Sequence, residues 1–311
     1  MVSSALRRFV KRFFVFLNIL LVLVFLVACL TPIVNPSEWW IHGFFSLATP
    51  YLVVLLLMTL VFWLITKPIW ALLPFLTLCL GYQQVSVVFA WNGNTLFTKR
   101  KPENCLRIVN WNIQGFNGMS RSKNLKNLVR EEIAASILKF KPDVICLQEF
   151  NSGQWENNIA LFTPTHPYHY FSKDFSSNNG QYHSGSIIFS KYPMLDSGRL
   201  AYPNEESLIF ADLKKGNQTI RVYTTHLQSF KFKENDYKNI ERIKESSEVN
   251  LSESKSLVRK MKKAYMTRGA QADQVKKALS QSPYPLVICG DFNDVPNSYT
   301  YFTIRQSLQD A

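Results

Sequence analysis

The chain has 311 residues, a formal net charge of +13 and a hydrophobic content of 47%. Its five cysteines show no CxxC spacing, which argues against a cysteine metal site or a disulfide framework. The basic balance favours an anionic partner such as nucleic acid, anionic lipid or a phosphorylated small molecule, but charge alone does not choose among them.

The average composition conceals two unlike parts. The first 98 residues contain five of the 35 basic residues and one of the 22 acidic residues, between long runs of Leu, Val, Phe and Trp. The remaining residues therefore carry a net charge of about +9 and have the character of a soluble domain. We expect a membrane region over residues 1–98 and a catalytic domain over residues 104–311.

Three apolar stretches are long enough to cross a bilayer as helices, at about 13–34, 44–65 and 69–90. Tryptophans fall near their ends, where amphipathic rings prefer the interface. The basic start would also suit a signal peptide, but the first apolar run is longer than a signal core. The third stretch contains Pro74 and Gly81 and could lie in the interface instead.

The basic residues that flank these stretches predict their orientation. The N-terminus is basic, the loop at residues 35–43 has no Lys or Arg, and the second loop contains Lys67. The expectation is therefore a multi-pass protein of the bacterial inner or plasma membrane, with its catalytic domain on the non-cytoplasmic side. Lys99, Arg100 and Lys101 oppose this orientation, and the domain would be cytoplasmic if the third stretch does not cross.

Short apolar runs alternate with amphipathic helices from about residue 104, which predicts a layered α/β domain. The expected helix lies at 122–140, and residues 231–281 form a charged, largely helical segment. Its first half, 231–255, resembles a mobile insertion, whereas 256–279 resembles a packed helix. The expected strands are 105–112, 143–147, 186–189, 208–212, 220–225 and 286–290.

Four of these strands end in polar residues that could bind a metal or a phosphate. They are Asn112, Glu149, His226, and Asp291 with Asn293. Strand ends that meet at one edge of a sheet commonly build such sites, and carboxylate and amide oxygens suit Mg²⁺, with Mn²⁺ as an alternative. A further carboxylate could activate water.

Each residue also has a structural interpretation when it is taken alone. Asn112 could be a turn residue, Glu149 could form a surface salt bridge, and His226 could be a structural histidine. The pair Asp291 and Asn293 could be an ordinary turn with an Asx cap. The set is more informative than its members, because each residue stands at the end of a strand.

The segments RIVNWNIQGF, KPDVICLQEF, SGSIIFSKYP, VYTTHLQS and PLVICGDFNDVPNSYTY together resemble the endonuclease/exonuclease/phosphatase superfamily. The resemblance covers about residues 104–311. It implies a DNase I-like four-layer α/β sandwich, in which helices flank two packed β-sheets. It also implies hydrolysis of a phosphoester bond by in-line attack of water, without a covalent intermediate.

The resemblance assigns a role to each candidate residue. Glu149 corresponds to the principal Mg²⁺ ligand and Asn112 to its companion. Asp291 corresponds to the carboxylate that orients or deprotonates the attacking water, Asn293 to a stabiliser of the pentacovalent phosphorus, and His226 to a hydrogen-bonding partner of the scissile phosphate.

One part of the family pattern is missing. Members of the family end with a Ser-Asp-His block, and no such block follows Asn293. Either the sequence is a fragment of a longer product or the protein has lost part of the site. We expect the fragment, and we expect the chain as given to have little or no activity.

The expected partners are the lipid bilayer and a phosphoester substrate, and no protein partner is evident. A nuclease is the first expectation for the function. A lipid head-group phosphodiesterase of the sphingomyelinase type and an inositol phosphatase are alternatives, and a catalytically silent membrane scaffold is a hypothesis of another class.

Overall fold

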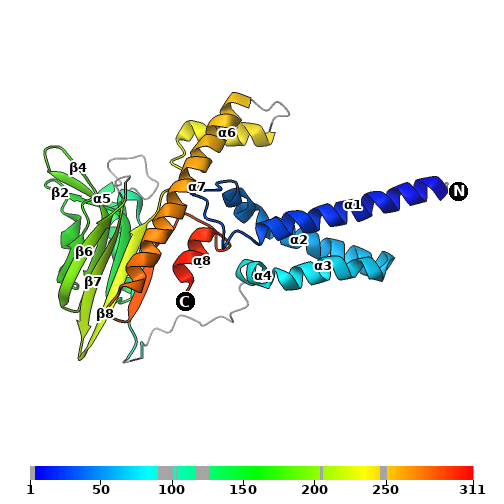
Figure 1. Ribbon diagram of the computed structural model, residues 1–311. Helices are drawn as coiled ribbons and strands as arrows, with labels where there is room; N and C mark the ends of the chain where they lie inside the picture. Colours follow the sequence, from blue (N-terminus) through cyan, green and yellow to red (C-terminus); the bar gives the residue numbers. More distant parts are fainter. Residues whose placement is uncertain are drawn as a thin grey trace. The chain divides into compact units, whose positions relative to one another are not determined.

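The computed structural model describes residues 4–89, 101–102, 104–116, 126–203, 206–245 and 251–310. The chain divides into two compact units (Figure 1). Unit 1 comprises Met1–Asn94, Phe230–Asp273 and Asp294–Ala311, and unit 2 comprises Thr95–Ser229 and Gln274–Asn293.

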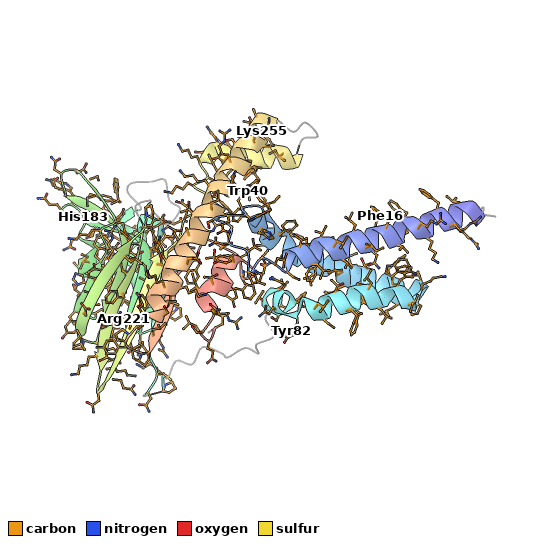
Figure 2. All side chains as sticks on the ribbon, in the orientation of Figure 1. Phe16, Trp40, Tyr82, His183, Arg221 and Lys255 are labelled. Atoms are coloured by element: carbon orange, nitrogen blue, oxygen red, sulfur yellow. The ribbon has the colours of Figure 1, made fainter. Side chains whose placement is uncertain are left out.

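Two helices of unit 1 are long and apolar enough to cross a membrane. Helix α1 spans Ser4–Ala28 and helix α2 spans His42–Thr66. Phe25, Val53 and Leu56 are fully buried between the helices of this region. Large apolar side chains on the outer faces, such as Phe16 in Figure 2, are exposed, as expected for surfaces that face lipid.

The third apolar stretch forms a bent pair of helices, α3 (Pro68–Leu80) and α4 (Tyr82–Val88). The two are inclined by 76° at Gly81, so the pair is either one broken span or a re-entrant segment. A Cβ atom on Gly81 would lie 2.4 Å from the Phe25 ring. The close approach of these helices therefore requires glycine at this position.

Unit 1 also contains helix α6 (Glu234–Glu245), the first part of helix α7 (Leu251–Ser280) and helix α8 (Tyr299–Arg305). The loop between α1 and α2 hydrogen-bonds to this part of the chain. Asn35 donates to Asp273 at 2.6 Å, and Thr31 donates to the Asn297 carbonyl at 3.0 Å. Asn297 in turn donates to the carbonyl of Ser46 at 2.7 Å.

Packing reinforces these hydrogen bonds. The Tyr265 ring of α7 contacts Phe44 edge-on, and a side chain on Gly43 would collide with it. The guanidinium of Arg268 is completely buried and donates to Asp294 at 3.2 Å. The N-terminal apolar helices, the first part of α7 and α8 thus share one folded unit.

Unit 2 contains two mixed β-sheets. The first has the order β1-β2-β5-β3, with β4 also paired to β5, and the second has the order β6-β7-β8-β9. The strands are β1 (Ile108–Asn112), β2 (Val144–Gly153), β3 (Tyr168–Phe171), β4 (Phe175–Ser177), β5 (Tyr182–Ser190), β6 (Met194–Ala201), β7 (Ser207–Lys215), β8 (Gln218–His226) and β9 (Leu286–Asp291).

The two sheets pack face to face, and helices lie on the outer faces. Cys146 and Ile188 of the first sheet meet Ile209 and Val222 of the second in one buried cluster. Helix α5 (Lys126–Lys139) buries Ile137 against the outer face of the first sheet. The end of α7 covers the second sheet, where the Tyr223 hydroxyl donates to the Ala278 carbonyl. The four-layer α/β sandwich is therefore confirmed.

Some elements differ from the sequence-based expectation. Strands β3, β4 and β6 were not expected, because their short runs are only partly buried and do not alternate clearly. The described residues of the segment 231–281 are largely helical, as expected: α6 starts at Glu234, and α7 starts at Leu251, five residues before the expected packed helix at 256. Two short 3₁₀ helices, Gln114–Phe116 and Asn158–Leu161, follow β1 and β2. The part of the expected helix at 122–125 lies outside the described residues.

Candidate active site

The predicted site residues meet because β1 is parallel to β2 and β8 is parallel to β9, although Glu149 lies at a bulge within β2 and not at the end of that strand, as had been expected. Strands β1 and β2 are parallel, and Asn112 pairs in register with Gln148, the residue before Glu149. Strands β8 and β9 are also parallel, and His226 pairs with Asp291. The first sheet therefore contributes Asn112 and Glu149, and the second contributes His226 and Asp291.

The side chain of Asn112 joins the two sheets. Its amide nitrogen lies 2.9 Å from Oε1 of Glu149 and 2.9 Å from Oδ2 of Asp291, so it donates to both carboxylates. Its Oδ1 atom accepts a hydrogen bond from the backbone N–H of Gln114 at 3.1 Å, which fixes the side chain. Two carboxylates thus share one donor at the centre of the site.

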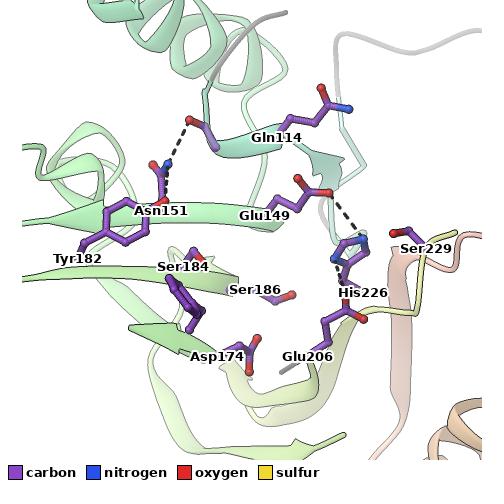
Figure 3. A pocket seen from close by; sticks show the side chains of 13 residues that line it. Gln114, Glu149, Asn151, Asp174, Tyr182, Ser184, Ser186, Glu206, His226 and Ser229 are labelled. Carbon is purple, nitrogen blue, oxygen red and sulfur yellow. Dashed lines mark hydrogen bonds and ion pairs between the residues drawn. The ribbon is translucent and has the colours of Figure 1, made fainter. Parts of the chain in front are cut away.

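His226 lies on the other side of these carboxylates. Its Nε2 atom is 3.7 Å from Glu149 and 3.9 Å from Asp291, and its Nδ1 atom is 3.8 Å from Oε1 of Glu206 (Figure 3). Because Glu206 lies at the opposite ring nitrogen, it is placed to orient the ring with Nε2 toward the site. The His226 side chain is only 13% exposed.

Backbone irregularities direct the acidic side chains. The register of β2 against β5 shifts between Leu147 and Phe150, and Glu149 within this bulge has a φ of 50°. A bulge re-aims a side chain and a positive φ is strained for glutamate, a combination common at functional sites.

The loop after β9 has a similar irregularity. Asn293 has a φ of 51°, its N–H donates to Oδ1 of Asp291 at 3.0 Å, and its amide group donates to the Leu227 carbonyl at 2.9 Å. Gly290 precedes them, and a Cβ there would lie 2.2 Å from the carbonyl oxygen of Thr225. Glycine therefore allows β9 to bring Asp291 against β8.

Hydrogen bonds between polar side chains link the strands that carry the candidate site residues. The amide nitrogen of Gln148 donates to Asn110 at 2.8 Å and to Thr224 at 2.7 Å. The Tyr202 hydroxyl hydrogen-bonds to Thr225, and burial raises the pKa of this phenol, so it stays protonated. These contacts rigidify the strands whose ends carry the candidate residues.

A cleft of about 390 Å³ opens beside Glu149 and His226 (Figure 3). Phe175 and Tyr182 contribute aromatic groups to its wall, and Asp174 and Glu206 contribute carboxylates. No Lys or Arg is among the described residues that line it. Asp174 also forms an ion pair with Arg199 at 2.8 Å.

The donor set suits a hard cation, although carboxylates are few. Within the described ranges, no group of three His, Cys, Asp or Glu side chains could hold a metal ion. Mg²⁺ needs only one or two protein carboxylates and keeps several waters. Glu149 offers such a carboxylate, 43% exposed, and a cation beside it would relieve the repulsion between Glu149 and Asp291.

Sequence reasoning found the strand-end residues but missed Glu206 and the supporting layer of Asn110 and Gln148. Glu206 directly precedes the buried run that begins at Ser207, and a charged residue at the start of a buried strand was an available signal. The hydrogen bonds that Gln148 makes to Asn110 and Thr224 leave no such signal in a single sequence.

Two family models match the chain. One is described as the endonuclease/exonuclease/phosphatase family and matches residues 109–310, about two thirds of the chain. The other is described as a domain of unknown function, DUF8431, and matches residues 11–88. No curated protein matches the chain.

Several solved structures are similar. Sphingomyelinase C from Streptomyces griseocarneus aligns with a TM-score of 0.43 and 18% identity, over 65% of this chain and 68% of that one. An endonuclease/exonuclease/phosphatase from Beutenbergia cavernae aligns with a TM-score of 0.41 and 19% identity, over 65% of this chain and 52% of that one. The catalytic domain of human Nocturnin aligns with a TM-score of 0.42 and 17% identity, over 65% and 69% of the two chains. This chain thus spans about half the length of the second structure.

Proposed function

The chain belongs to the endonuclease/exonuclease/phosphatase family, and from this membership we propose that it hydrolyses a phosphoester bond with the help of a divalent cation. The observation that carries the proposal is the convergence of Glu149 and Asp291 on the amide nitrogen of Asn112, with His226 beside them. Asp291 is the candidate base, Glu149 is the candidate metal ligand, and His226 is the candidate hydrogen-bond donor to the scissile phosphate. The arrangement brings all three together.

Glu149 would hold the cation, and Asn112 is its proposed companion. When bound, Mg²⁺, or alternatively Mn²⁺, would polarise the phosphoryl oxygen and stabilise the leaving oxygen. The Asn112 amide group points its nitrogen toward both carboxylates in this structure. Its oxygen would face a cation only after an exchange of the amide nitrogen and oxygen positions, which are assigned from hydrogen bonding.

We propose that Asp291 orients the attacking water or accepts its proton. Its Oδ1 accepts the backbone N–H of Asn293, which leaves Oδ2 directed at the centre of the site. His226 would donate from Nε2 to the scissile phosphate while Glu206 holds the opposite side of its ring. One N–H of the Asn293 side chain donates to the Leu227 carbonyl, and the other would donate to an oxygen of the pentacovalent phosphorus.

Nucleic acid is the first substrate class, because the chain outside the first 98 residues carries a net charge of about +9. The second candidate is the phosphodiester of a lipid head group. A specific observation favours it: the described walls of the cleft are acidic and aromatic, which suits a small or cationic head group better than a polyanion.

We also propose that the protein is a multi-pass membrane protein with its catalytic residues on the non-cytoplasmic side. Arg7, Lys11 and Lys67 line one cleft at the same end of the helices, whereas the α1–α2 loop has no Lys or Arg. That loop bonds to Asp273 and Asn297, which lie within the family-matched segment.

The test is hydrolysis by the full chain in lipid nanodiscs with Mg²⁺. Nicking of supercoiled plasmid and release of head group from labelled phospholipid would be measured in parallel. Activity that is lost in chelator and in Asp291→Asn supports the proposal, and the active assay identifies the substrate class. A folded protein that binds Mg²⁺ but is inactive in both assays would contradict the proposal that this chain hydrolyses either substrate class.

A further inference from the structure

A groove runs between α1 and α2 of the membrane region and is independent of the candidate active site. One cavity of about 960 Å³ lies at the basic end of the helices, and another of about 530 Å³ lies deeper between them. The two share Phe14, Phe62 and Trp63 as lining residues, so they adjoin at these side chains.

The mouth of this groove is strongly cationic. Arg7 and Lys11 of α1 and Lys67 after α2 all line it. The first 98 residues contain a single acidic residue, Glu38, which follows the opposite end of α1. This region of the chain therefore offers no carboxylate for the mouth, and three positive charges near one another favour an external anion.

The interior of the groove has apolar walls and two polar side chains without a partner among the described residues. Trp63 is 3% exposed, and its indole N–H has no hydrogen-bond acceptor. Asn18 is 1% exposed, and neither its amide nitrogen nor its amide oxygen has a partner. Unpaired polar groups at membrane depth are costly and mark functional positions.

We propose that this groove binds one anionic phospholipid. Its phosphate lies between Arg7, Lys11 and Lys67, and an ester carbonyl accepts the N–H of Trp63. Trp63 precedes Lys67 by four residues, about 6 Å along a helix, which suits the depth of an ester group below a phosphate. The acyl chain follows the walls formed by Leu17, Leu21, Leu55 and Met58.

The occupant is specified by both ends of the groove. A soluble phosphate would satisfy the cationic mouth but not the unpaired Trp63 N–H. A zwitterionic lipid would fill the groove, but its cationic head group would add a positive charge beside Arg7, Lys11 and Lys67. An anionic phospholipid satisfies both. Nothing in this inference depends on the proposed hydrolysis.

The test uses the full chain in nanodiscs of phosphatidylcholine and phosphatidylglycerol with identical acyl chains, followed by native mass spectrometry of retained lipid. We expect one phosphatidylglycerol per chain in preference to phosphatidylcholine, and no displacement by inorganic phosphate. Lys11→Gln combined with Lys67→Gln should lower retention by about tenfold to thirtyfold, given about 1 kcal/mol per basic residue near a membrane surface. Arg12→Gln is the matched control, because Arg12 does not line the groove.

A neutral variant tests the site without changing the charge that orients the helices. Trp63→Phe removes only the N–H and should lower retention about fivefold, whereas Trp39→Phe, at an exposed loop position, should not. Equal retention of the two lipids, or equal losses in Arg12→Gln and in the lysine variant, would overturn the proposal. So would retention that is unchanged in Trp63→Phe.

Discussion

The Nδ1 atom of His226 lies 3.8 Å from Oε1 of Glu206. The two residues come from the end of β8 and the start of β7, neighbouring antiparallel strands. Because Glu206 lies at Nδ1 and Glu149 lies at Nε2, we propose that Glu206 positions the His226 ring.

Glu206→Gln tests this relationship. We expect kcat to fall about tenfold with little change in KM, because the ring loses its orienting charge but the substrate contacts remain. Glu206→Asp should recover part of the loss. Glu156→Gln, an exposed glutamate, is the control. A change in KM alone would contradict the positioning role.

Asp291→Asn should reduce turnover by roughly 10²- to 10⁴-fold, because an amide cannot accept the proton of the attacking water. The substitution keeps the shape of the side chain and its acceptor for the Asn293 N–H. Asp196→Asn on β6 is a matched control at an exposed site. Turnover equal to wild type would remove Asp291 from the mechanism.

Glu149→Gln should weaken Mg²⁺ binding by at least about tenfold, because the substitution removes the charged ligand from a site with few carboxylates. Calorimetric titration of the full chain in nanodiscs measures this directly and needs no substrate. The wild type in chelator should bind nothing further. If both proteins bind Mg²⁺ equally, the cation is held elsewhere.

The contacts of the Asp143 carboxylate with Lys101 and with the Arg107 N–H should weaken in acid. Burial alone would raise the pKa of Asp143, but hydrogen bonds from Lys101 and the Arg107 backbone, with the charges of Lys101 and Lys191, outweigh it and lower the pKa. The folded-state pKa is thus below the unfolded value, so the stabilisation is complete above about pH 4 and is lost as pH falls through the folded pKa.

Asp143→Asn should therefore lower the free energy of opening of β2 by about 1–3 kcal/mol at neutral pH, and by less in acid. Hydrogen exchange of the β2 amides across this pH range measures the difference. A difference that is constant with pH would contradict the electrostatic origin.

The contact between Asn35 and Asp273 can be tested by swapping the two side chains. Asn35→Asp places two carboxylates together, and Asp273→Asn removes the charged acceptor. Each should speed hydrogen exchange in the segment 294–302, because the loop packs against this part of unit 1. The double variant swaps the carboxylate and the amide between the two positions, so the rate of hydrogen exchange should return toward that of the wild type. Additive effects would show that the contact contributes nothing.

Much of the fold and of the candidate site could be predicted from the apolar runs and the polar residues that follow them. Asn112, Glu149, His226 and Asp291 each follow an apolar run in the sequence, and parallel pairing of β1 with β2 and of β8 with β9 brings them together. Glu206 escaped prediction because its role depends on antiparallel pairing of β7 with β8, which sets residues far apart in sequence side by side. The roles of the site residues remain predictions.

The N-terminal apolar region shows a different limit of prediction from sequence. Hydropathy located the apolar stretches but not the bend at Gly81, which depends on contact with Phe25 of another helix. Nor could composition reveal that Asn35 and Thr31 hydrogen-bond to residues more than 230 positions away. Long-range polar contacts of this kind leave no periodic pattern.

The network around Asn297 also bears on how such a protein can evolve. Asn297 belongs to the segment matched by the endonuclease/exonuclease/phosphatase family, yet it bonds to the carbonyl of Ser46 and to Thr31, within the segment matched by DUF8431. Recombination that replaced one segment with an unrelated counterpart would leave these buried groups unpaired. The two segments are thus expected to be inherited together, as a lineage rather than as interchangeable modules.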